Sequence, residues 1–513
     1  MSSYTEPTWG FYGRAAEQAE IEKVLSSGRW FFCAISGRRR IGKTTLIQQA
    51  LKSRANIANI TPFYFQVPDS DERGVVQAFQ DALEDSGVQP EKVQKFFRTF
   101  RDMAETIAVM CNLGWVVVID EFQYFHRKVL SPFTSFLQEQ VDKLRDTEKG
   151  GLFVLGSIHT EMTAILEDRS SPLFNRVTHR IEVGHWDFAT LFEMLDAHGV
   201  TDPAHRLFLW SLFEGVPKFY RDCFEQGVLR TQEHYRRETI RRLFFEGSSP
   251  LRDEATNWFL RELRGRYESV LKLLAYKGPC SYRELVAEYG RAGSGDERQL
   301  SVYLRTLTER YQMVEKQQPI FAGDNSRKAR YTIADNFLRS WLHSLARNVQ
   351  IARIRPVNEA INRADEALKI QEGHAFEKMV RLMTEECSRK GVGDFELTDI
   401  VRGYWNKQDG SDIEIDLVAY NEEEAVARLG SCKRSAARHN ETALRIFDEH
   451  LDRFLKTKEG KRFSNWTMGK ALYAPSFPLT QRKSLEAQDY HCLDLNDFAR
   501  FLGRPVLPLF DTG

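Results

Sequence analysis

The sequence lacks several features that would place a protein in a specialised class. It has seven cysteines, with no CxxC pair and no histidines at metal-ligand spacing around them, which argues against a disulfide framework or a zinc site. No apolar run is long enough to span a bilayer, and the first residues lack the basic and apolar segments of a signal peptide. We therefore expect a cytoplasmic protein that makes no membrane contact.

The chain also lacks an excess of charge of either sign. Lys and Arg together number 72, and so do Asp and Glu, so any contact with nucleic acid must come from local basic patches. No repeat of 20–50 residues and no low-complexity segment is present, which excludes solenoid and linker architectures. A length of 513 residues with 42% hydrophobic composition predicts about three or four domains, each with its own core.

The pattern along the chain predicts three kinds of structure in turn. Up to about residue 181, short apolar runs alternate with helical periods, which indicates a parallel sheet covered by helices, with strands at 30–36, 62–67, 115–119, 152–156 and 179–183. The following segments, 188–197, 203–213 and 230–246, have the pattern of amphipathic helices and suggest a helical lid. Helices at 267–276, 282–289 and 296–310, followed by strands at 313–316 and 330–333, suggest a winged helix. A final α/β region begins near Ala346.

The strongest motif is GRRRIGKT at residues 37–44, which matches GxxxxGK[ST] and directly follows an apolar run. In such a loop, backbone N–H groups converge on phosphate, the lysine reaches the β- and γ-phosphates, and the threonine hydroxyl binds Mg²⁺. The sequence therefore predicts an ATP site, with a chance glycine turn as the alternative. Its expected members are Gly37, Arg38, Arg39, Arg40, Ile41, Gly42, Lys43, Thr44 and Thr45.

A second motif supports hydrolysis. The apolar run 115–119 ends in Asp120 and Glu121. Downstream of a phosphate loop, the first carboxylate is expected to hold Mg²⁺ and the second to orient or deprotonate the attacking water, whereas the alternative is a solvated strand end.

Two further residues are weaker candidates. Ser157 ends the run 151–156, where it could sense the γ-phosphate or simply cap the next helix. Arg176 precedes the last expected strand and could act as an arginine finger, in cis or from a neighbouring subunit, or be a surface arginine.

These motifs, together with the string FYGR at 11–14, SPLFNR at 171–176 and EGVPKFY at 214–220, resemble the archaeal-type ATPases of the STAND/AAA+ branch. The resemblance covers about the first 220 residues. It implies that Gly13 and Arg14 lie near the adenine and that Arg176 is the finger candidate. Proteins with this ATPase often continue into a winged helix and a D/E-x-K restriction-endonuclease fold, and residues 331–337 resemble their junction.

The resulting fold class is α/β, with a P-loop parallel sheet followed by three further parts. The expected domains are 1–185 for the ATPase core, 186–262 for the helical lid, 263–345 for the winged helix and 346–513 for a restriction-endonuclease-like α/β domain.

The C-terminal segment resembles the nuclease core through Glu377, Asp416 and Lys433. A metal-dependent phosphodiesterase needs carboxylates on Mg²⁺ and a lysine near the water, which Asp416 as metal ligand and the other two could supply. However, Ser431 stands where the pattern expects an acid, and a serine hydroxyl is a poor Mg²⁺ ligand. Either another acid such as Glu414 or Glu441 substitutes, or the domain has lost cleavage, in which case Asp416 and Lys433 are a plain ion pair.

The expected winged helix adds a DNA hypothesis. Basic and polar residues on its third helix and wing could contact phosphates and groove edges: Arg298, Gln299, Arg305, Arg310, Lys316, Arg327, Lys328 and Arg330. The acidic residues Asp296, Glu297 and Glu309 in the same region favour the alternative, a plain interdomain connector.

Taken together, the sequence predicts an ATP- and Mg²⁺-dependent switch whose nucleotide state controls a DNA-binding winged helix and a nuclease-like domain. The alternative is a signalling scaffold that binds a protein partner or itself and keeps an inactive C-terminal recognition domain.

Overall fold

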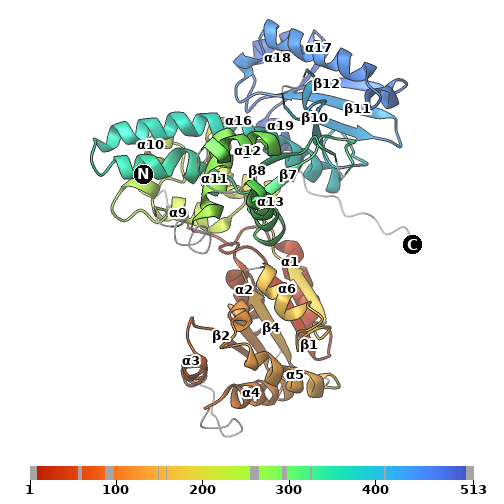
Figure 1. Cartoon of the computed structure of the whole chain (residues 1–513). Helices are drawn as coiled ribbons and strands as arrows, with labels where there is room; N and C mark the ends of the chain where they lie inside the picture. Colours follow the sequence, from red (N-terminus) through yellow and green to blue (C-terminus); the bar gives the residue numbers. More distant parts are fainter. Residues whose placement is uncertain are drawn as a thin grey trace, which may run out of the picture. The chain divides into compact units, whose positions relative to one another are not determined.

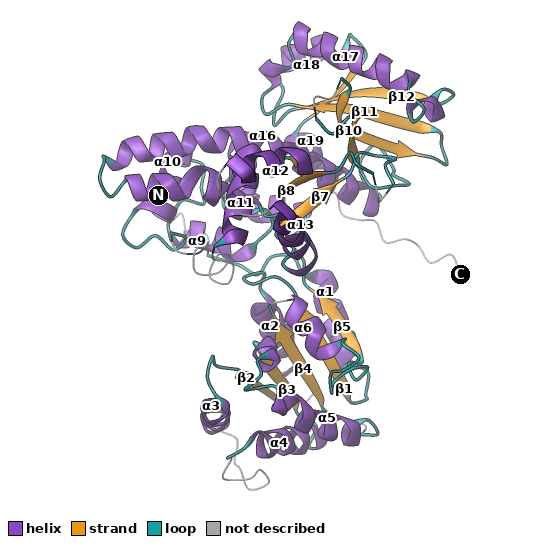
Figure 2. Cartoon of the chain, viewed as in Figure 1, coloured by secondary structure: helices purple, strands orange, loops and turns teal. Residues whose placement is uncertain are grey.

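A computed structural model describes residues 8–55, 61–86, 98–147, 149–157, 159–252, 254, 265–291, 297–323, 326–409 and 412–503 (Figures 1 and 2). The chain forms two compact units. The nucleotide unit, as we call it, comprises Gly13–Trp186 and Val216–Lys218, and the second unit comprises the described parts of Met1–Tyr12, Asp187–Gly215 and Phe219–Gly513. The four domains expected from the sequence stay a prediction. Among the described residues, no helix is long and apolar enough to cross a membrane.

The nucleotide unit is built on a sheet of five parallel strands. The strands are β1 (Phe31–Ser36), β2 (Pro62–Gln66), β3 (Val116–Asp120), β4 (Gly151–Gly156) and β5 (His179–Glu182). Their order is β2-β3-β4-β1-β5, so β4 lies between β1 and β3. All five expected strands are confirmed to within one residue at each end. β1, β3 and β4 are almost wholly buried, which is why they appear in the sequence as continuous apolar runs.

Helices cover this sheet. They are α1 (Ala15–Leu25), α2 (Lys43–Ala55), α3 (Glu72–Asp85), α4 (Phe100–Asn112), the 3₁₀ helix η2 (Phe122–His126), α5 (Pro132–Leu144) and α6 (His159–Leu166). The start of α3 is fixed by Asp71, whose carboxylate accepts from the Gly74 N–H at 3.0 Å, and the start of α4 by a capping box between Thr99 and Asp102.

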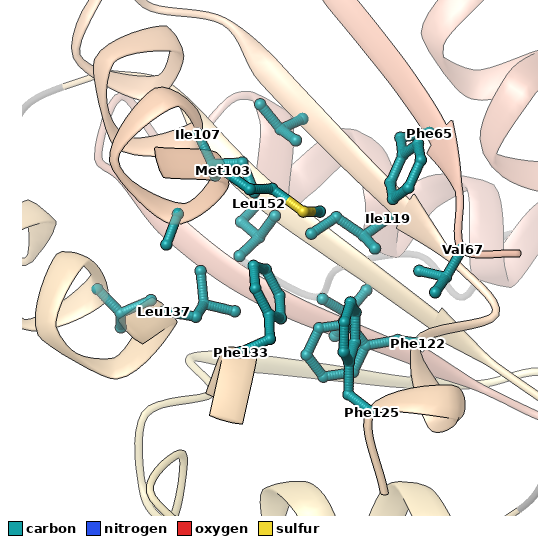
Figure 3. Packing of buried hydrophobic residues seen from close by; sticks show 14 of the residues in the cluster. Phe65, Val67, Met103, Ile107, Ile119, Phe122, Phe125, Phe133, Leu137 and Leu152 are labelled. Carbon is teal, nitrogen blue, oxygen red and sulfur yellow. The ribbon is translucent and has the colours of Figure 1, made fainter. Parts of the chain in front are cut away.

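The largest core of this unit holds η2 in place (Figure 3). Phe122 and Phe125 of η2 are fully buried, and the Phe125 ring stacks on Phe133 with centroids 4.2 Å apart. Strand residues such as Ile119 and Leu152 belong to the same cluster. The residues that follow β3 are therefore anchored by packing, and Glu121 and Gln123 lie on a rigid segment.

The second unit begins with the expected helical region. Its helices are α7 (Phe188–Ala197), α8 (Pro203–Phe213), α9 (Pro217–Glu225, whose first two residues belong to the nucleotide unit), α10 (Tyr235–Ile240) and the π-helical turn η3 (Arg241–Phe245). The expected helices at 188–197 and 203–213 are confirmed. Asp187 and Asp202 cap α7 and α8 by accepting from backbone N–H groups.

A winged-helix arrangement follows. It consists of α11 (Arg266–Lys277), β6 (Cys280–Ser281), α12 (Tyr282–Arg291), α13 (Glu297–Arg305), the π-helical turn η5 (Thr306–Arg310), β7 (Val314–Gln317) and β8 (Arg330–Ile333). β7 and β8 form an antiparallel hairpin, and the short β6, which the sequence analysis did not anticipate, pairs with β8.

The C-terminal part of the second unit is a mixed sheet with helices. It contains α14 (Asn336–Ser340), the π-helical turn η6 (Trp341–Leu345), α15 (Ala346–Ile351), the long α16 (Val357–Arg389), β9 (Arg402–Trp405), β10 (Glu414–Asn421), β11 (Val426–Cys432), α17 (Glu441–Lys456), β12 (Thr467–Tyr473), α18 (Leu479–Glu486), β13 (Tyr490–Leu493) and α19 (Leu495–Leu502). The strand order is β13-β12-β11-β10-β9; the β11-β12 and β12-β13 pairs are parallel, and the β9-β10 and β10-β11 pairs are antiparallel.

Candidate functional site

The loop between β1 and α2 has the geometry that its glycines require. A Cβ at Gly37 would lie 2.4 Å from the carbonyl oxygen of Val183, so the backbone that follows β5 leaves room for glycine alone. Gly42 has φ +93°, in the region that favours glycine. The motif therefore lies on a curled strand-to-helix loop, as the sequence predicted.

Lys43, the first residue of α2, lies at the centre of the site. Its ammonium donates to the carbonyl oxygens of Gly37 and Arg38 at 2.9 and 3.1 Å and to the Ser157 hydroxyl at 3.0 Å. Burial lowers the pKa of Lys43 to about 8, and the nearby Asp120 and Glu121 carboxylates oppose that shift. This buried cation is placed to bind phosphate oxygens.

Asp120, the last residue of β3, forms a cluster of oxygen ligands with its neighbours. Its Oδ2 accepts from the Thr44 hydroxyl at 2.6 Å and from the Tyr64 hydroxyl at 2.8 Å. The Thr44 hydroxyl and the Asp120 carboxylate are the hard oxygen donors that Mg²⁺ prefers, and the expected metal would need only these two protein ligands beside phosphate and water. The residues present therefore fit Mg²⁺, and Tyr64 orients Asp120 from β2.

Glu121 is held by a residue to which the sequence analysis assigned no role. The Gln123 side-chain amide donates to Glu121 Oε2, and its carbonyl oxygen accepts from the Ser157 N–H at 3.1 Å. Gln123 is 2% exposed, and Glu121 has φ +56°, a left-handed conformation. Gln123 therefore joins the candidate base to the end of β4, and the site is completed by two polar side chains, the partly buried Tyr64 and the buried Gln123.

The strand order explains why Ser157 belongs to this site. β4 lies between β1 and β3, so the residue that follows β4 lies between the phosphate loop and the Asp120-Glu121 pair. The Ser157 hydroxyl accepts from Lys43 while its N–H donates to Gln123. The structure thus brings the candidate sensor to the predicted place, and its sensing role stays a prediction.

The remaining loop candidates surround Lys43 in different ways. Arg14 is buried and donates to the loop carbonyl of Ile41 at 3.1 Å, and its other contact is Glu17 at 2.8 Å. Arg38 contacts His185 at 3.4 Å, and the side chains of Arg39 and Thr45 are exposed. Arg14 supports the loop backbone, and the adenine contact expected for it and for Gly13 stays a prediction.

Arg176 is not brought to this site, so the expectation of a finger in cis is wrong. The register pairs Cys33 with His179, which places Arg176 level with the start of β1, whereas the phosphate loop follows the end of β1. Six residues of strand separate those levels by about 20 Å. Arg176 instead forms two hydrogen bonds, of 2.9 and 2.8 Å, to the Asp142 carboxylate on α5. A role toward a neighbouring subunit stays a prediction.

The C-terminal centre brings together two of its predicted residues on adjacent strands. Asp416 on β10 accepts from the Cys432 N–H at 2.8 Å, from the Ser431 hydroxyl at 3.4 Å and from the Lys433 ammonium at 3.4 Å. One carboxylate oxygen, Oδ2, takes all three contacts. The charge of Asp416 is therefore balanced by groups of the chain itself.

Glu377 on α16 faces the same centre. Burial raises the pKa of Glu377 well above its ordinary value, and the neighbouring Asp416 carboxylate raises it further. Of the acids that might replace the one missing at Ser431, Glu414 pairs with Arg330 at 2.7 Å and Glu441 is exposed at the start of α17. Across the described residues, no three His, Cys, Asp or Glu side chains form a group that could hold a metal ion.

The winged-helix candidates divide into two groups. Arg298, Arg305, Arg310, Lys316 and Arg327 are exposed, whereas the Gln299 amide oxygen accepts from the Tyr303 hydroxyl at 2.8 Å. The other two contact the C-terminal sheet. The Arg330 guanidinium lies 4.7 Å from the Trp405 ring centroid, and the Lys328 carbonyl accepts from the Trp405 indole N–H at 2.8 Å. The Arg330 side chain is thus engaged within the unit, and the phosphate contacts expected of Arg330 and Lys328 stay a prediction.

Comparison with known proteins adds two family matches. Residues 11–218 match an ATPase domain found predominantly in Archaea, and residues 341–444 match archaeal and bacterial proteins of unknown function. The first match spans the phosphate loop, Asp120 and Ser157. The chain therefore carries an archaeal-type P-loop ATPase domain, as the resemblance implied, followed by a C-terminal domain whose family has no known function.

Three similar proteins illustrate the range of relatives. The uncharacterized protein MJECL04 of Methanocaldococcus jannaschii is 23% identical over 81% of this chain and 86% of its own length. The Walker-type ATPase PABY2304 of Pyrococcus abyssi is 17% identical, with 65% of this chain and 96% of that chain covered and a TM-score of 0.47. The ORC2 protein of Aeropyrum pernix is 14% identical, with 72% and 97% covered and a TM-score of 0.45.

Proposed function

We propose that this protein binds and hydrolyses ATP and that its nucleotide state controls the winged helix and the C-terminal domain. The observation that carries the proposal is the convergence of three segments: Lys43 and Thr44 at the start of α2, the Asp120-Glu121 pair at the end of β3, and Ser157 after β4. A buried ammonium, two Mg²⁺-type ligands and a positioned carboxylate are the parts that phosphoryl transfer to water needs. A binding loop alone would not need Glu121 to be held by a buried amide.

Each residue has a distinct part in the proposed reaction. Lys43 binds phosphate oxygens, and Thr44 and Asp120 hold Mg²⁺, which would neutralise charge on the phosphates. Glu121 orients the attacking water and accepts its proton. Ser157 contacts Lys43 and responds to the phosphate that this lysine binds.

Two substitutions separate binding from hydrolysis. Lys43→Ala should remove ATP binding, because it removes the buried ammonium that lies between the Gly37 and Arg38 carbonyls and the Ser157 hydroxyl. Glu121→Gln should keep ATP binding and lose hydrolysis, since the amide fills the same space but accepts no proton. Lys23→Ala, an exposed lysine on α1, is the matched control. Unaltered hydrolysis in both site variants, measured as phosphate release, would refute the assignment.

We further propose that the winged helix binds DNA through α13. Arg305 on α13 and Arg310 on the turn η5 that follows it are exposed, and neither forms an ion pair in the part of the chain that the structure describes. Arg305→Glu should weaken DNA binding and reduce its salt dependence, whereas Arg445→Glu on the exposed face of α17 should not. Equal affinities for the wild type and Arg305→Glu would favour a connector role.

A second candidate function is a scaffold whose C-terminal domain recognises a partner without cleaving DNA. The contacts of Asp416 favour it, because Ser431, the Cys432 N–H and Lys433 all engage one carboxylate oxygen. Plasmid cleavage with Mg²⁺ or Mn²⁺, with and without ATP and beside Asp416→Ala, decides between the two. Cleavage that Asp416→Ala abolishes would make the protein a nuclease, and intact plasmid with active ATP hydrolysis would support the scaffold.

A further inference from the structure

A cavity of about 550 Å³ lies within the second unit. Its walls come from β7 of the winged helix, from one face of α16 and from β9 of the C-terminal sheet. No residue of this cavity belongs to the ATP site, and the proposed function assigns it no ligand. The volume is that of a small-molecule site, which typically measures about 300–1,000 Å³.

Four cationic side chains line the cavity: Lys316, Lys378, Arg381 and Arg402. Among the described residues, two acids, Glu315 and Glu385, line it as well. Glu385 already accepts from the Val401 N–H at 2.9 Å, so part of its charge is used within the wall. Lys378 is paired with Glu214 at 2.6 Å, so the lining keeps a small excess of positive charge, carried by Lys316, Arg381 and Arg402 beside the two acids. In a concave, partly desolvated site an anion binds more strongly than on an open surface.

The cations differ in how many hydrogen bonds and ion pairs they already form with other residues of the chain. Lys378 donates to Glu214 and to the Ala334 carbonyl at 2.6 and 2.8 Å, which fixes its position in the wall. Arg381 interacts electrostatically with Glu377, which lies one turn earlier on α16. For Arg402, no ion pair or side-chain hydrogen bond is found among the described residues. Of these side chains, the Arg402 guanidinium therefore has the most N–H donors left for hydrogen bonds to phosphate oxygens.

Besides Gln317 and Gln318, the remaining wall consists of apolar side chains. Leu382 is 38% and Ile400 49% exposed, although both are large aliphatic residues, and Val401 and Ala322 lie beside them. A simple inorganic anion would leave this apolar surface uncovered. A ligand with a phosphate group on a flat, weakly polar body would cover both kinds of wall.

We propose that this cavity binds a nucleotide through its phosphate, with the base and sugar against the Leu382 and Ile400 wall. A free mononucleotide and the phosphorylated end of a strand offer the same chemistry, and the experiment below separates them. Because the walls come from the winged helix and from the C-terminal domain, the bound ligand contacts both. Its binding favours the arrangement in which β7 and α16 face each other.

The test measures binding at the cavity in full-length protein that carries Lys43→Ala, which removes the lysine of the phosphate loop. The probe is N-methylanthraniloyl-AMP, followed by fluorescence anisotropy. Arg402→Glu should weaken its binding by at least about tenfold, since a charge-assisted hydrogen bond is lost and repulsion is added. Arg445→Glu, on the exposed face of α17, should leave the affinity unchanged. If ATP fails to bind at the phosphate loop, these outcomes still stand, because Lys43→Ala is present throughout.

Two further arms identify the source of the phosphate. The labelled nucleoside without phosphate should bind at least about tenfold more weakly than the labelled AMP. Tight binding of a 5′-phosphorylated oligonucleotide, with weak binding of labelled AMP, would assign the cavity to a strand end.

If Arg402→Glu does not fold, which thermal melting reveals, Arg402→Gln gives the same comparison with the shape of the wall better preserved. No binding of either labelled ligand at 1 mM overturns the proposal. Equal affinities for the Arg402 variant and the parent protein overturn it as well.

Discussion

Gln123→Met offers a sharp test of how the ATP site is organised. The Gln123 side chain is 2% exposed and makes two hydrogen bonds, one to the Glu121 carboxylate and one from the Ser157 N–H. Methionine fills a similar volume with neither donor nor acceptor of comparable strength. The substitution therefore removes the link between Glu121 and β4 while disturbing the apolar surroundings little.

The magnitude follows from the two bonds. A typical buried hydrogen bond contributes about 1–1.5 kcal/mol, so about 2–3 kcal/mol of positioning is lost. If this positioning serves the attacking water, that energy appears in the activation barrier and corresponds to a fall in kcat of about 30- to 150-fold. KM should change little, because Lys43 keeps its contact with the Gly37 carbonyl of the loop and Thr44 keeps its hydrogen bond to Asp120 at the end of β3.

The assay is steady-state phosphate release together with ATP affinity from a fluorescent analogue. Gln77→Met, an exposed glutamine on α3 that bonds Asp81, is the control and should behave as wild type. A variant that is less stable in thermal melting, yet hydrolyses ATP at the wild-type rate, would show that Gln123 only supports the fold. That result would refute the positioning role.

Three further predictions follow from other contacts. Gly37→Ala should abolish ATP binding, because the added Cβ would lie 2.4 Å from the Val183 carbonyl oxygen; normal affinity in an equilibrium binding assay would contradict the loop geometry. Glu372→Ala should lower the free energy of unfolding of the second unit by about 3–5 kcal/mol, because Arg236 and Arg434 lose the buried carboxylate that they contact at 2.5 and 2.6 Å. Chemical denaturation measures this loss, and Glu366→Ala, at an exposed glutamate, is the control. Asp394 is buried in part, but hydrogen bonds from His491 and Arg428 hold its pKa below the ordinary value for an aspartate. The ionised carboxylate therefore stabilises the fold at pH values above that ordinary pKa, and this stabilisation is lost as the pH falls below it. The difference in unfolding free energy between wild type and Asp394→Asn should shrink between pH 6 and pH 3, and a constant difference would contradict the pairing.

The sequence was informative where function depends on a local string. The loop at 37–44 and the Asp120-Glu121 pair each lie on one strand and its following turn, so their letters predict both structure and chemistry. Ser157 could be placed as well, because strand order rules bring the ends of parallel strands to one edge.

Other parts of the site depend on tertiary contacts that carry no local signal. Gln123 is a polar residue in an otherwise apolar 3₁₀ turn, and only the fold shows that its amide reaches Glu121 and Ser157. The same holds for Tyr64, whose strand neighbours suggest simple burial. The interpretation of Arg176 as a finger in cis was wrong because a motif string does not reveal which end of the sheet the residue occupies.

The C-terminal centre shows that gathering the right residue types does not by itself make a metal site. The Lys433 ammonium lies 3.4 Å from Asp416, and the Asp416 carboxylate acts on the pKa of Glu377, yet serine stands at position 431, where the resemblance implies an acid. With a second carboxylate at that position, two negative groups would face Lys433 and a cation would be needed to offset their repulsion. With serine there, Asp416 accepts from the Lys433 ammonium, the Cys432 N–H and the Ser431 hydroxyl, and burial beside Asp416 raises the pKa of Glu377. The contacts of Asp416 are thus made within the chain, whereas Lys43, Thr44 and Asp120 converge beside a loop of the P-loop type, so the proposed ATP site is the firmer basis for the proposed catalytic role.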